Sequence, residues 1–355
     1  MSVPFWPPPS ERYPGRLPAK VDVLVVGGGI TGVSLMHHLA SRRLDAALVE
    51  RERLASGASG RNAGFLLAGV AESYAAAVRL YGRQPARDIW ELTVENHDRQ
   101  VGAVTGHEVG HRRGGGLILA AGPEEALELE ESAELLREDG FAARWDGTAL
   151  LNPRDGEIQP AALVGALARQ APAGSIREGV EVTALEPWAS GVTVYAGGDR
   201  CEAGAVVLAT NAYTPTLLPE VGIAPNRAQM LATAPVTRRV CELPTYSHFG
   251  YRYWRQLTSG EVLIGGWRDT SLPTEVTDDA EPTEPIQALL DRHAASIGAE
   301  VPVTHRWAGT MGFTKSGLPL VGPVGGMRNV YLCAGFNGHG MGFAFMSAKN
   351  LVDTL

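Results

Sequence analysis

The sequence predicts an α/β protein, α+β overall, in which a parallel sheet flanked by helices is interleaved with an antiparallel sheet. Residues 21–26 form a mostly apolar run that leads into three glycines and then an apolar helical pattern. Similar runs return at 205–210 and 329–335, and such runs are typical of strands buried on both faces of a parallel sheet. Between 226 and 270 apolar and polar residues alternate, which indicates antiparallel strands.

The composition is that of a large globular chain. The 355 residues, 45% of them apolar, are enough for one or two domains. The chain has 31 basic and 39 acidic residues, a net charge of −8, and its basic residues are scattered, so we expect no nucleic-acid partner. Four glycines and two histidines interrupt the only long apolar run, 21–40, so we expect no membrane span.

The cysteines and histidines indicate neither disulfides nor a metal site. The three cysteines are widely separated and form no C-x-x-C pair, which is typical of buried, unreactive thiols. With no secretory signal at the N-terminus, this pattern predicts a cytoplasmic protein. No Cys/His grouping has the spacing of metal ligands, so no metal is expected.

The sharpest motif is Gly27-x-Gly29-x-x-Gly32, which follows the first predicted strand and opens the first helix. Glycines there permit a tight turn, close approach of a pyrophosphate and close helix packing. Glu50 ends the next strand, where it would hold the ribose hydroxyls of an adenine dinucleotide. An ordinary glycine-rich turn is the alternative, but this context favours a Rossmann-like site. No second such motif follows, so we expect electrons to come directly from the substrate.

The segments around this unit are predicted in order along the chain. Residues 1–18 contain six prolines and form an extended arm that lies on the body or is disordered. Residues 55–64 form a loop of small residues, rich in backbone donors and suited to contact a phosphate. Helical patterns cover 71–105 and 124–139, with a short strand at 117–120 between them. We expect this segment to be an insertion.

The second half alternates between the two predicted sheets. A helix begins at Gln159-Pro160, and strands follow near 180–186, 191–196 and 200–209, the last returning to the parallel sheet. The strand at 329–335 precedes a glycine-rich turn and a terminal helix. The predicted domains are an arm (1–20), a discontinuous dinucleotide-binding domain (21–80, 150–220 and 300–355) and a substrate or cap domain (81–149 and 221–299).

Six motifs occur in a specific order: Gly27-x-Gly29-x-x-Gly32, Glu50, the loop Ala58-Ser59-Gly60-Arg61-Asn62-Ala63-Gly64, the segment Leu208-Ala209-Thr210-Asn211-Ala212, residues 307–322, and Ala334-Gly335-Phe336-Asn337-Gly338-His339-Gly340. In this order the chain resembles the D-amino-acid oxidase superfamily of FAD enzymes, from about Val21 to the C-terminus. It is most similar to the branch of glycine oxidase, sarcosine oxidase and gamma-glutamylputrescine oxidase, because the Arg61-Asn62 loop and residues 307–322 are typical of that branch.

The resemblance implies bound FAD and a terminal loop that passes beneath its ring. A helix starting near Gly340 would direct its positive end at the ring edge where reduced flavin carries negative charge. Sarcosine oxidase has a cysteine tether near the segment matched by 311–314, and none is present here, so we expect non-covalent FAD. The predicted FAD-binding residues are Gly27, Gly29, Ile30, Thr31, Gly32, Glu50, Arg51, Ser59, Gly60, Arg61, Asn62, Val182, Thr210, Asn211, Gly335, Asn337, Gly338, His339, Gly340 and Met341.

The substrate pocket is predicted from the strand at 251–255. Tyr251, Tyr253 and Arg255 share one face of this strand, and Arg252 and Trp254 the other. The predicted substrate residues are Tyr251, Tyr253, Arg255 and Trp307. The predicted catalytic residues are His339, Arg268 and Tyr253.

Each of these assignments has an alternative. The aromatic residues could simply pack a sheet, Arg268 could be a solvated hairpin arginine, and His339 could cap its own turn. Gly342 stands where sarcosine oxidase has a carboxylate-binding lysine. This departure puts sarcosine in doubt as the substrate.

The implied activity is oxidation of the C–N bond of an amine or amino acid by hydride transfer to FAD, with hydrolysis of the resulting imine. Oxygen, giving hydrogen peroxide, or another acceptor would reoxidise the flavin. Two alternatives stay open: a 2-hydroxy-acid or polyol-phosphate dehydrogenase, and a non-catalytic FAD-bearing subunit. The substrate, its stereochemistry, the acceptor and the oligomeric state are not determined by the sequence.

Overall fold

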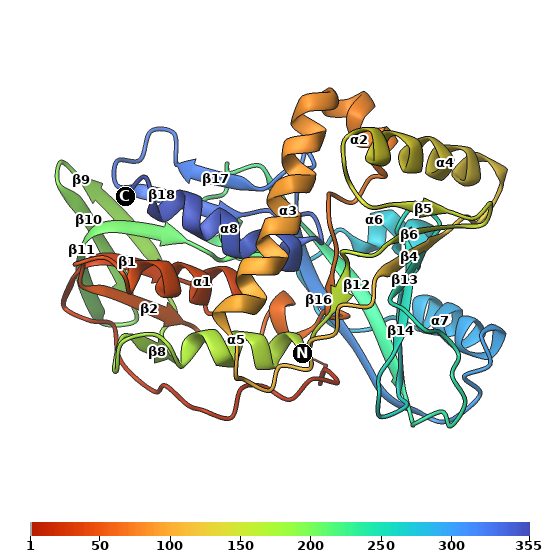
Figure 1. Ribbon diagram of the computed structural model, residues 1–355. Helices are drawn as coiled ribbons and strands as arrows, with labels where there is room; N and C mark the ends of the chain where they lie inside the picture. Colours follow the sequence, from red (N-terminus) through yellow and green to blue (C-terminus); the bar gives the residue numbers. More distant parts are fainter. Residues whose placement is uncertain (1) are drawn as a thin grey trace.

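The computed structural model describes residues 2–355 and contains two eight-stranded sheets that lie side by side (Figure 1). The strands of the first sheet are β1 (Lys20–Val26), β2 (Ala46–Glu50), β8 (Ile176–Glu178), β9 (Ala184–Trp188), β10 (Gly191–Ala196), β11 (Asp199–Leu208), β17 (Leu320–Pro323) and β18 (Val330–Ala334). Their order is β17-β18-β11-β1-β2-β8, and β10 and β9 extend from β11. The pairs β1–β11, β1–β2, β2–β8 and β11–β18 are parallel, which confirms the predicted parallel sheet.

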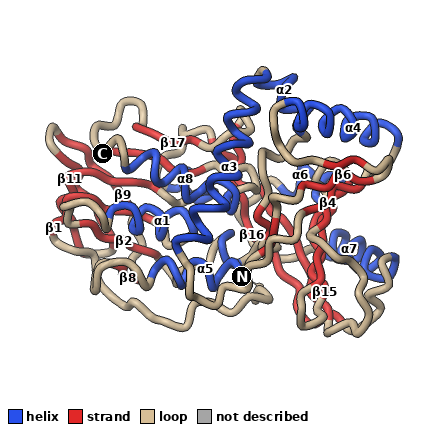
Figure 2. The backbone as a smooth tube through the Cα atoms, in the orientation of Figure 1, coloured by secondary structure: helices blue, strands red, loops and turns tan. Residues whose placement is uncertain are grey.

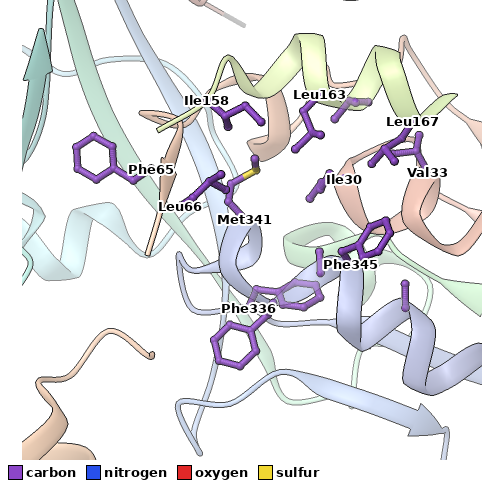
Figure 3. Close-up of a cluster of buried hydrophobic side chains, with 14 of the residues drawn as sticks. Ile30, Val33, Phe65, Leu66, Ile158, Leu163, Leu167, Phe336, Met341 and Phe345 are labelled. Atoms are coloured by element: carbon purple, nitrogen blue, oxygen red, sulfur yellow. The ribbon is translucent and has the colours of Figure 1, made fainter. Parts of the chain in front are cut away.

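Both faces of β1 are buried, as its continuous apolar run predicts. Val23 and Val25 pack into the core that contains the helices, and Leu24 and Val26 into the core that contains β10. The helices on the first face are α1 (Ile30–Leu39), α3 (Arg83–Ala103), α5 (Pro160–Ala168) and α8 (Gly340–Val352). Helix α1 packs against α8 and α5, and α8 packs against α3. Figure 3 shows side chains of this core from α1, α5 and α8: Ile30, Val33, Leu163, Leu167, Met341 and Phe345.

The second sheet is antiparallel except at one pair. Its strands are β4 (Gly116–Leu119), β5 (Arg144–Trp145), β6 (Ala149–Asn152), β12 (Ile223–Thr233), β13 (Thr245–Ser247), β14 (Arg252–Gln256), β15 (Val262–Gly266) and β16 (Val303–Thr314). The order is β16-β12-β15-β14-β13-β4-β6-β5, and only β13–β4 is parallel. In Figure 2 the strands form two groups, one carrying β1 and β11 and the other β4 and β15. This arrangement confirms the predicted α/β fold with an antiparallel second part.

Three features differ from the sequence prediction. The helical pattern at 71–105 is interrupted at Gly82, whose φ of +90° is left-handed, so α2 (Tyr74–Tyr81) and α3 are separate helices. Residues 300–355 were assigned to the dinucleotide-binding domain, but β16 pairs with β12 in the second sheet along almost its whole length. Helix α7 (Glu284–Ser296), which packs against β12 and β15, was not predicted.

The remaining elements are short or lie at the edge of the second sheet. Helix α4 (Pro123–Glu138) packs against α2 (Figure 1). The others are α6 (Leu272–Glu275), the two-stranded sheet of β3 (Phe65–Leu66) and β7 (Gly156–Glu157), and the 3-10 helices η1 (Ala58–Gly60), η2 (Asn211–Thr216) and η3 (Arg268–Ser271). Within residues 2–355, no helix combines the length and the apolar character needed to cross a bilayer.

The amino-terminal arm lies on the body of the protein, which is one of the two predicted outcomes. The Trp6 side chain is only 5% exposed. Further along, the amide of Glu178 in β8 donates to the carbonyl of Tyr13 at 2.6 Å. Ser2 reaches the second sheet, where its hydroxyl accepts a hydrogen bond from the amide of Ala308. The arm therefore contacts both sheets.

Candidate functional site

A cavity of about 780 Å³ begins at the carboxyl end of β1 and extends to the second sheet. Its walls come from the β1–α1 turn, the loop at 55–64, the loop before α8, and strands β13 and β14. The volume lies in the range of small-molecule and cofactor sites. The cavity therefore joins the predicted dinucleotide turn and the predicted substrate strand in one site.

The glycines of the β1–α1 turn leave no room for side chains. A Cβ on Gly32 would lie 1.9 Å from the carbonyl oxygen of Gly27, and a Cβ on Gly29 would lie 2.8 Å from Ser59 Oγ. Gly27 has a φ of +112°, and a Cβ there would lie 2.8 Å from the carbonyl oxygen of Ala209. Each of these positions requires glycine because neighbouring backbone or loop atoms approach it closely. The turn therefore leaves a narrow space at the start of α1, where a phosphate could approach the backbone.

Glu50 lines the cavity at the end of β2. Its carboxylate accepts hydrogen bonds from the amides of Gly28 at 2.6 Å and Glu52 at 2.9 Å. Burial raises the pKa of Glu50, and these two amide donors oppose the rise. A carboxylate has about four acceptor positions, so Glu50 can still accept from hydroxyl groups of a ligand. Next to it, the Arg51 guanidinium lies 4.2 Å from the ring centre of Tyr213.

The loop at 55–64 is shaped by its own polar side chains. Ser59 Oγ accepts from the amide of Ile30, which ties the loop to the start of α1. Asn62 donates to the carbonyls of Ala58 and Ser59. Arg61 donates to the carbonyl oxygens of Ser56 and Ala308. Burial lowers the pKa of Arg61. Ser59, Arg61 and Asn62 all line the cavity, as predicted, while holding the loop in shape.

Three donors bind the loop's carbonyls from behind. The indole N–H of Trp307 donates to the carbonyl of Arg61 at 2.9 Å. The indole N–H of Trp6 donates to Asn62 at 2.7 Å, and Arg255 donates to Gly64 at 3.1 Å. These donors come from β16, the arm and β14, so both the second sheet and the arm support the loop.

The structure does not bring Arg255 and Trp307 to the cavity, contrary to the expectation that they contact substrate. Trp307 is fully buried. Arg255 is 2% exposed, donates to the carbonyls of Gly64 and Ile158, and lies 3.6 Å from Glu157. Burial lowers the pKa of Arg255 to about 10. Arg255 shares a face of β14 with Tyr253, but the end of the strand that carries Arg255 lies under the loop at 55–64.

The loop before α8 forms the wall at the other end of the cavity. Asn337 accepts from the amide of Thr314 at 2.9 Å and donates to Gly335 at 2.8 Å. Asn211 accepts from the amide of Gly335 at 3.0 Å. Helix α8 then starts at Gly340, with no acidic residue in its first turn, and this turn lines the cavity. The positive end of the α8 dipole is therefore at the cavity, as the sequence predicted.

Gly342 also has a steric explanation. A Cβ at this position would lie 2.8 Å from the main-chain carbonyl oxygen of Leu67. A lysine could be accommodated here only if the backbone at residue 67 moved.

Aromatic and charged side chains of the second sheet line the far end of the cavity. The Arg268 guanidinium lies between the rings of Tyr251, at 4.6 Å, and Phe313, at 4.7 Å. Among residues 2–355 no carboxylate pairs with Arg268. Burial raises the pKa of Tyr253 to about 12, and the charge of Arg268 opposes this. Burial also lowers the pKa of His339. The site thus combines a fixed, unpaired cation with a neutral imidazole and phenol groups.

The structure brings most of the predicted site residues to this cavity. Of these residues, five do not line it: Gly32, Gly60, Gly335, Arg255 and Trp307. The glycines among them act through close packing; a Cβ on Gly60 would lie 2.2 Å from the Ala55 carbonyl oxygen. Tyr246 and Glu72 are among the lining residues that the sequence did not predict. Tyr246 pairs with Tyr253 across β13 and β14, which its alternating strand pattern could have shown. Glu72 has no such signal in the sequence.

Asp155 is a buried carboxylate whose charge acts on Tyr246, and its ionisation is predicted to reduce stability. Asp155 is 6% exposed, accepts from the amide of Ala68, and burial raises its pKa to about 8. An unfolded aspartate ionises near pH 4. The stability that protonated Asp155 contributes is therefore fully present below about pH 4, and it is lost as the pH rises through the folded pKa of about 8.

We expect Asp155→Asn to raise the free energy of unfolding by about 1–3 kcal/mol at pH 8, and much less at pH 4.5. The asparagine oxygen can still accept from Ala68. Urea unfolding at the two pH values, with flavin or other ligand conditions held constant, measures the difference. An equal effect at both pH values would show that ionisation of Asp155 is not the cause.

The fold and the cavity define a dinucleotide-binding class of α/β protein, with the glycine turn on one sheet and a wall of aromatic and charged side chains on the other. A family model for FAD-dependent oxidoreductases (DAO) matches residues 22–354. The chain therefore belongs to the DAO family of FAD-dependent oxidoreductases. The cradle at Gly27–Gly32, the carboxylate of Glu50 and the α8 N-terminus suit the phosphates, ribose and flavin of FAD.

Several curated relatives match nearly the whole chain. The chain is 28% identical over 98% of its length to the tRNA-modifying bifunctional protein MnmC of Maricaulis maris, but spans only about half (54%) of that protein. It is 28% identical to probable oxidoreductase OrdL of Rhizobium meliloti, covering 93% of this chain and 82% of the relative. It is 26% identical to gamma-glutamylputrescine oxidoreductase of Escherichia coli, covering 94% and 83%.

Solved structures share the fold. Glycine oxidase of Geobacillus kaustophilus superposes with a TM-score of 0.75 at 24% identity, covering 95% of each chain. L-proline dehydrogenase of P. horikoshii superposes with a TM-score of 0.76 at 22% identity, covering 95% of this chain and 93% of that one. These matches confirm the predicted fold, and the family model and the curated relatives confirm the resemblance noted in the sequence.

Proposed function

We propose that this protein oxidises the C–N bond of a primary or secondary amine or amino acid, giving an imine that water hydrolyses. The observation that carries this proposal is Arg268, an unpaired cation held between two aromatic rings in the wall of the cavity. Such a guanidinium is suited to bind a substrate carboxylate. The similarity to gamma-glutamylputrescine oxidoreductase and to glycine oxidase, named for an amine and an amino acid, supports this substrate class.

In this proposal FAD lies along the cavity, with its phosphates at the Gly27–Gly32 turn, its ribose on Glu50 and its ring near residues 335–341. Bound there, FAD supplies the acceptor for the hydride that the substrate carbon loses. The α8 N-terminus stabilises negative charge at that end of the cavity. Tyr251 and Tyr253 position the substrate beside Arg268, and the half-buried His339, whose pKa is lowered by desolvation, offers a hydrogen bond without a competing positive charge.

We propose that FAD is bound without a covalent link. The segment 311–314 contains no cysteine, and Cys333, the cysteine nearest to it in sequence, is fully buried in β18. Acid precipitation of the yellow holoprotein is expected to release all the flavin into the supernatant. Flavin that stays with the precipitated protein after washing would contradict this.

The hydrogen bond behind the loop is expected to matter for FAD affinity. Trp307→Phe keeps an aromatic ring but removes the indole N–H, so the buried carbonyl of Arg61 loses its donor. An unsatisfied buried acceptor costs about 1–3 kcal/mol, so we expect the Kd for FAD to rise by about 10-fold, since about 1.4 kcal/mol is a factor of ten. Titration of apoprotein with FAD measures the change.

Trp188→Phe is the matched control for this experiment, because Trp188 is 45% exposed on β9 and lies outside the cavity. Its Kd for FAD should equal that of the wild type. An unchanged Kd in Trp307→Phe would mean that the loop keeps its shape without this hydrogen bond.

Product analysis tests the reaction itself. Holoenzyme is incubated in air with a panel of amines and amino acids and, in parallel, with 2-hydroxy acids and polyol phosphates. We expect ammonia, or the released amine for a secondary substrate, together with peroxide or reduction of an added quinone. Turnover of hydroxy acids alone would instead make the protein a 2-hydroxy-acid or polyol-phosphate dehydrogenase. Bound flavin that no compound reduces would indicate a non-catalytic subunit.

A further inference from the structure

Glu72 is a carboxylate in the cavity wall whose charge no other residue satisfies. It lies just before α2, where the main cavity adjoins a second one of about 410 Å³, and it lines both. Its Oε2 atom is buried and has no hydrogen-bond partner. Within residues 2–355 no ion pair reaches its carboxylate, although Lys315 lines the second cavity.

In the other two carboxylates at this end of the cavity, both oxygens have partners within the protein. Glu125 accepts from the main-chain amides of three residues, which are Ala121, His248 and Phe249. Glu128 binds the hydroxyl of Ser73 and the guanidinium of Arg79. Both are structural carboxylates. Glu72 differs from them because it lines both cavities while one of its carboxylate oxygens is buried without a partner.

A buried carboxylate oxygen without a partner is costly, and such groups are rare in folded proteins. A cationic group on a bound ligand would supply the missing partner. The charge of Glu72 raises the pKa of His339, whereas that of Arg268 lowers it. The two opposite charges therefore act on the same imidazole, at the end of the cavity away from the glycine turn.

The nitrogen that is oxidised is a poor partner for Glu72. That nitrogen must be unprotonated before its carbon can lose a hydride, and a carboxylate in contact with it would stabilise the protonated form. Glu72 is better suited to a nitrogen that stays protonated throughout the reaction.

We infer that Glu72 binds a second, non-reacting ammonium group, so that the substrates are diamines, diamino acids or their derivatives. The inference rests on the proposed amine oxidation and specifies its substrate class. A diamino acid would satisfy both unpaired charges, its carboxylate on Arg268 and its second ammonium on Glu72. A simple monoamine would leave Glu72 without a partner.

Binding of matched ligands to the anaerobic holoenzyme tests this inference. The pairs are ornithine with norvaline, as both enantiomers, and putrescine with butylamine; each pair differs by one terminal ammonium group. Affinities are measured from the perturbation of the flavin spectrum or by calorimetry. A charged hydrogen bond contributes enough for a preference of about 10-fold or more. We expect this preference for at least one diamino ligand.

Three variants assign the preference to Glu72. Glu72→Gln should remove it while leaving the affinity for norvaline or butylamine within about twofold of wild type, because only the charged contact is lost. Glu72→Asp should keep part of the preference. Glu131→Gln is the matched control, since Glu131 is half exposed outside the cavity, and it should bind every ligand like wild type.

The inference is overturned if no diamino ligand binds more tightly than its partner, or if Glu72→Gln weakens both members of each pair equally. Failure of the proposed reaction is a separate outcome. If no amine reduces the flavin but the preference is present and disappears in Glu72→Gln, the ammonium site stands and the proposed oxidation does not.

Discussion

Replacing Arg268 with alanine is expected to lower kcat/KM for an amino-acid substrate by about 100-fold, equivalent to about 2.7 kcal/mol of transition-state stabilisation. The guanidinium is held between Tyr251 and Phe313 and has no carboxylate partner among residues 2–355. Its donors are therefore available to a substrate carboxylate without breaking an internal ion pair. A monoamine has no carboxylate and does not use this contact, so the variant should affect only substrates that carry a carboxylate.

The comparison of each amino acid with its decarboxylated amine makes this prediction specific. Steady-state assays should show the loss for the amino acid and a change of less than about threefold for the amine, because the amine makes no charged contact with Arg268. Arg292→Ala is the control, since Arg292 is exposed on α7 and does not line the cavity. Equal losses for both substrates would mean that Arg268 acts on the flavin or on oxygen rather than on a carboxylate.

Gly32→Ala is expected to abolish FAD binding. The added Cβ would lie 1.9 Å from the Gly27 carbonyl oxygen and 3.1 Å from Leu48, so α1 would have to move away from β1. Moving the helix opens the turn that approaches the pyrophosphate. We expect at least a 100-fold rise in the Kd for FAD, or protein that folds without flavin, from the loss of several phosphate contacts.

The matched control for this substitution is Gly102→Ala. Gly102 is exposed within α3, and a Cβ there meets no atom within 4 Å. Alanine favours helix over glycine by up to about 1 kcal/mol, so this variant should be at least as stable as wild type and fully yellow. The flavin-to-protein ratio of each purified variant gives the answer. A normal ratio in Gly32→Ala would mean that FAD binds elsewhere.

Local patterns predicted the parts of the structure that depend on neighbouring residues. The glycine turn, the strand before it and Glu50 lie within one βαβ unit, so spacing alone was enough to predict their arrangement. The start of α8 at Gly340 was predicted from the glycine-rich turn directly before it. The parallel return of residues 205–210 followed from the buried character of that run, which suits only the middle of a sheet.

The features that the sequence could not predict depend on contacts between residues far apart in the chain. Trp307 belongs to one of the motifs in the sequence. Its indole lies behind the loop at 55–64 because β16 pairs with β12. Arg255 and Tyr253 share one face of β14, as predicted. The loop at 55–64 covers Arg255 and leaves Tyr253 at the cavity. Glu72 was missed because its significance is the lack of a partner, which only the arrangement of its neighbours shows.

In the proposed reaction, FAD in this cavity takes electrons from an amine. Anaerobic mixing of the purified yellow protein with amines, amino acids and polyamines tests it most directly, since no second enzyme or acceptor takes part. The account predicts that at least one amine bleaches the flavin absorbance and that admitting oxygen or a quinone restores it. A protein that stays colourless when FAD is supplied, or a flavin that only hydroxy acids bleach, would contradict it.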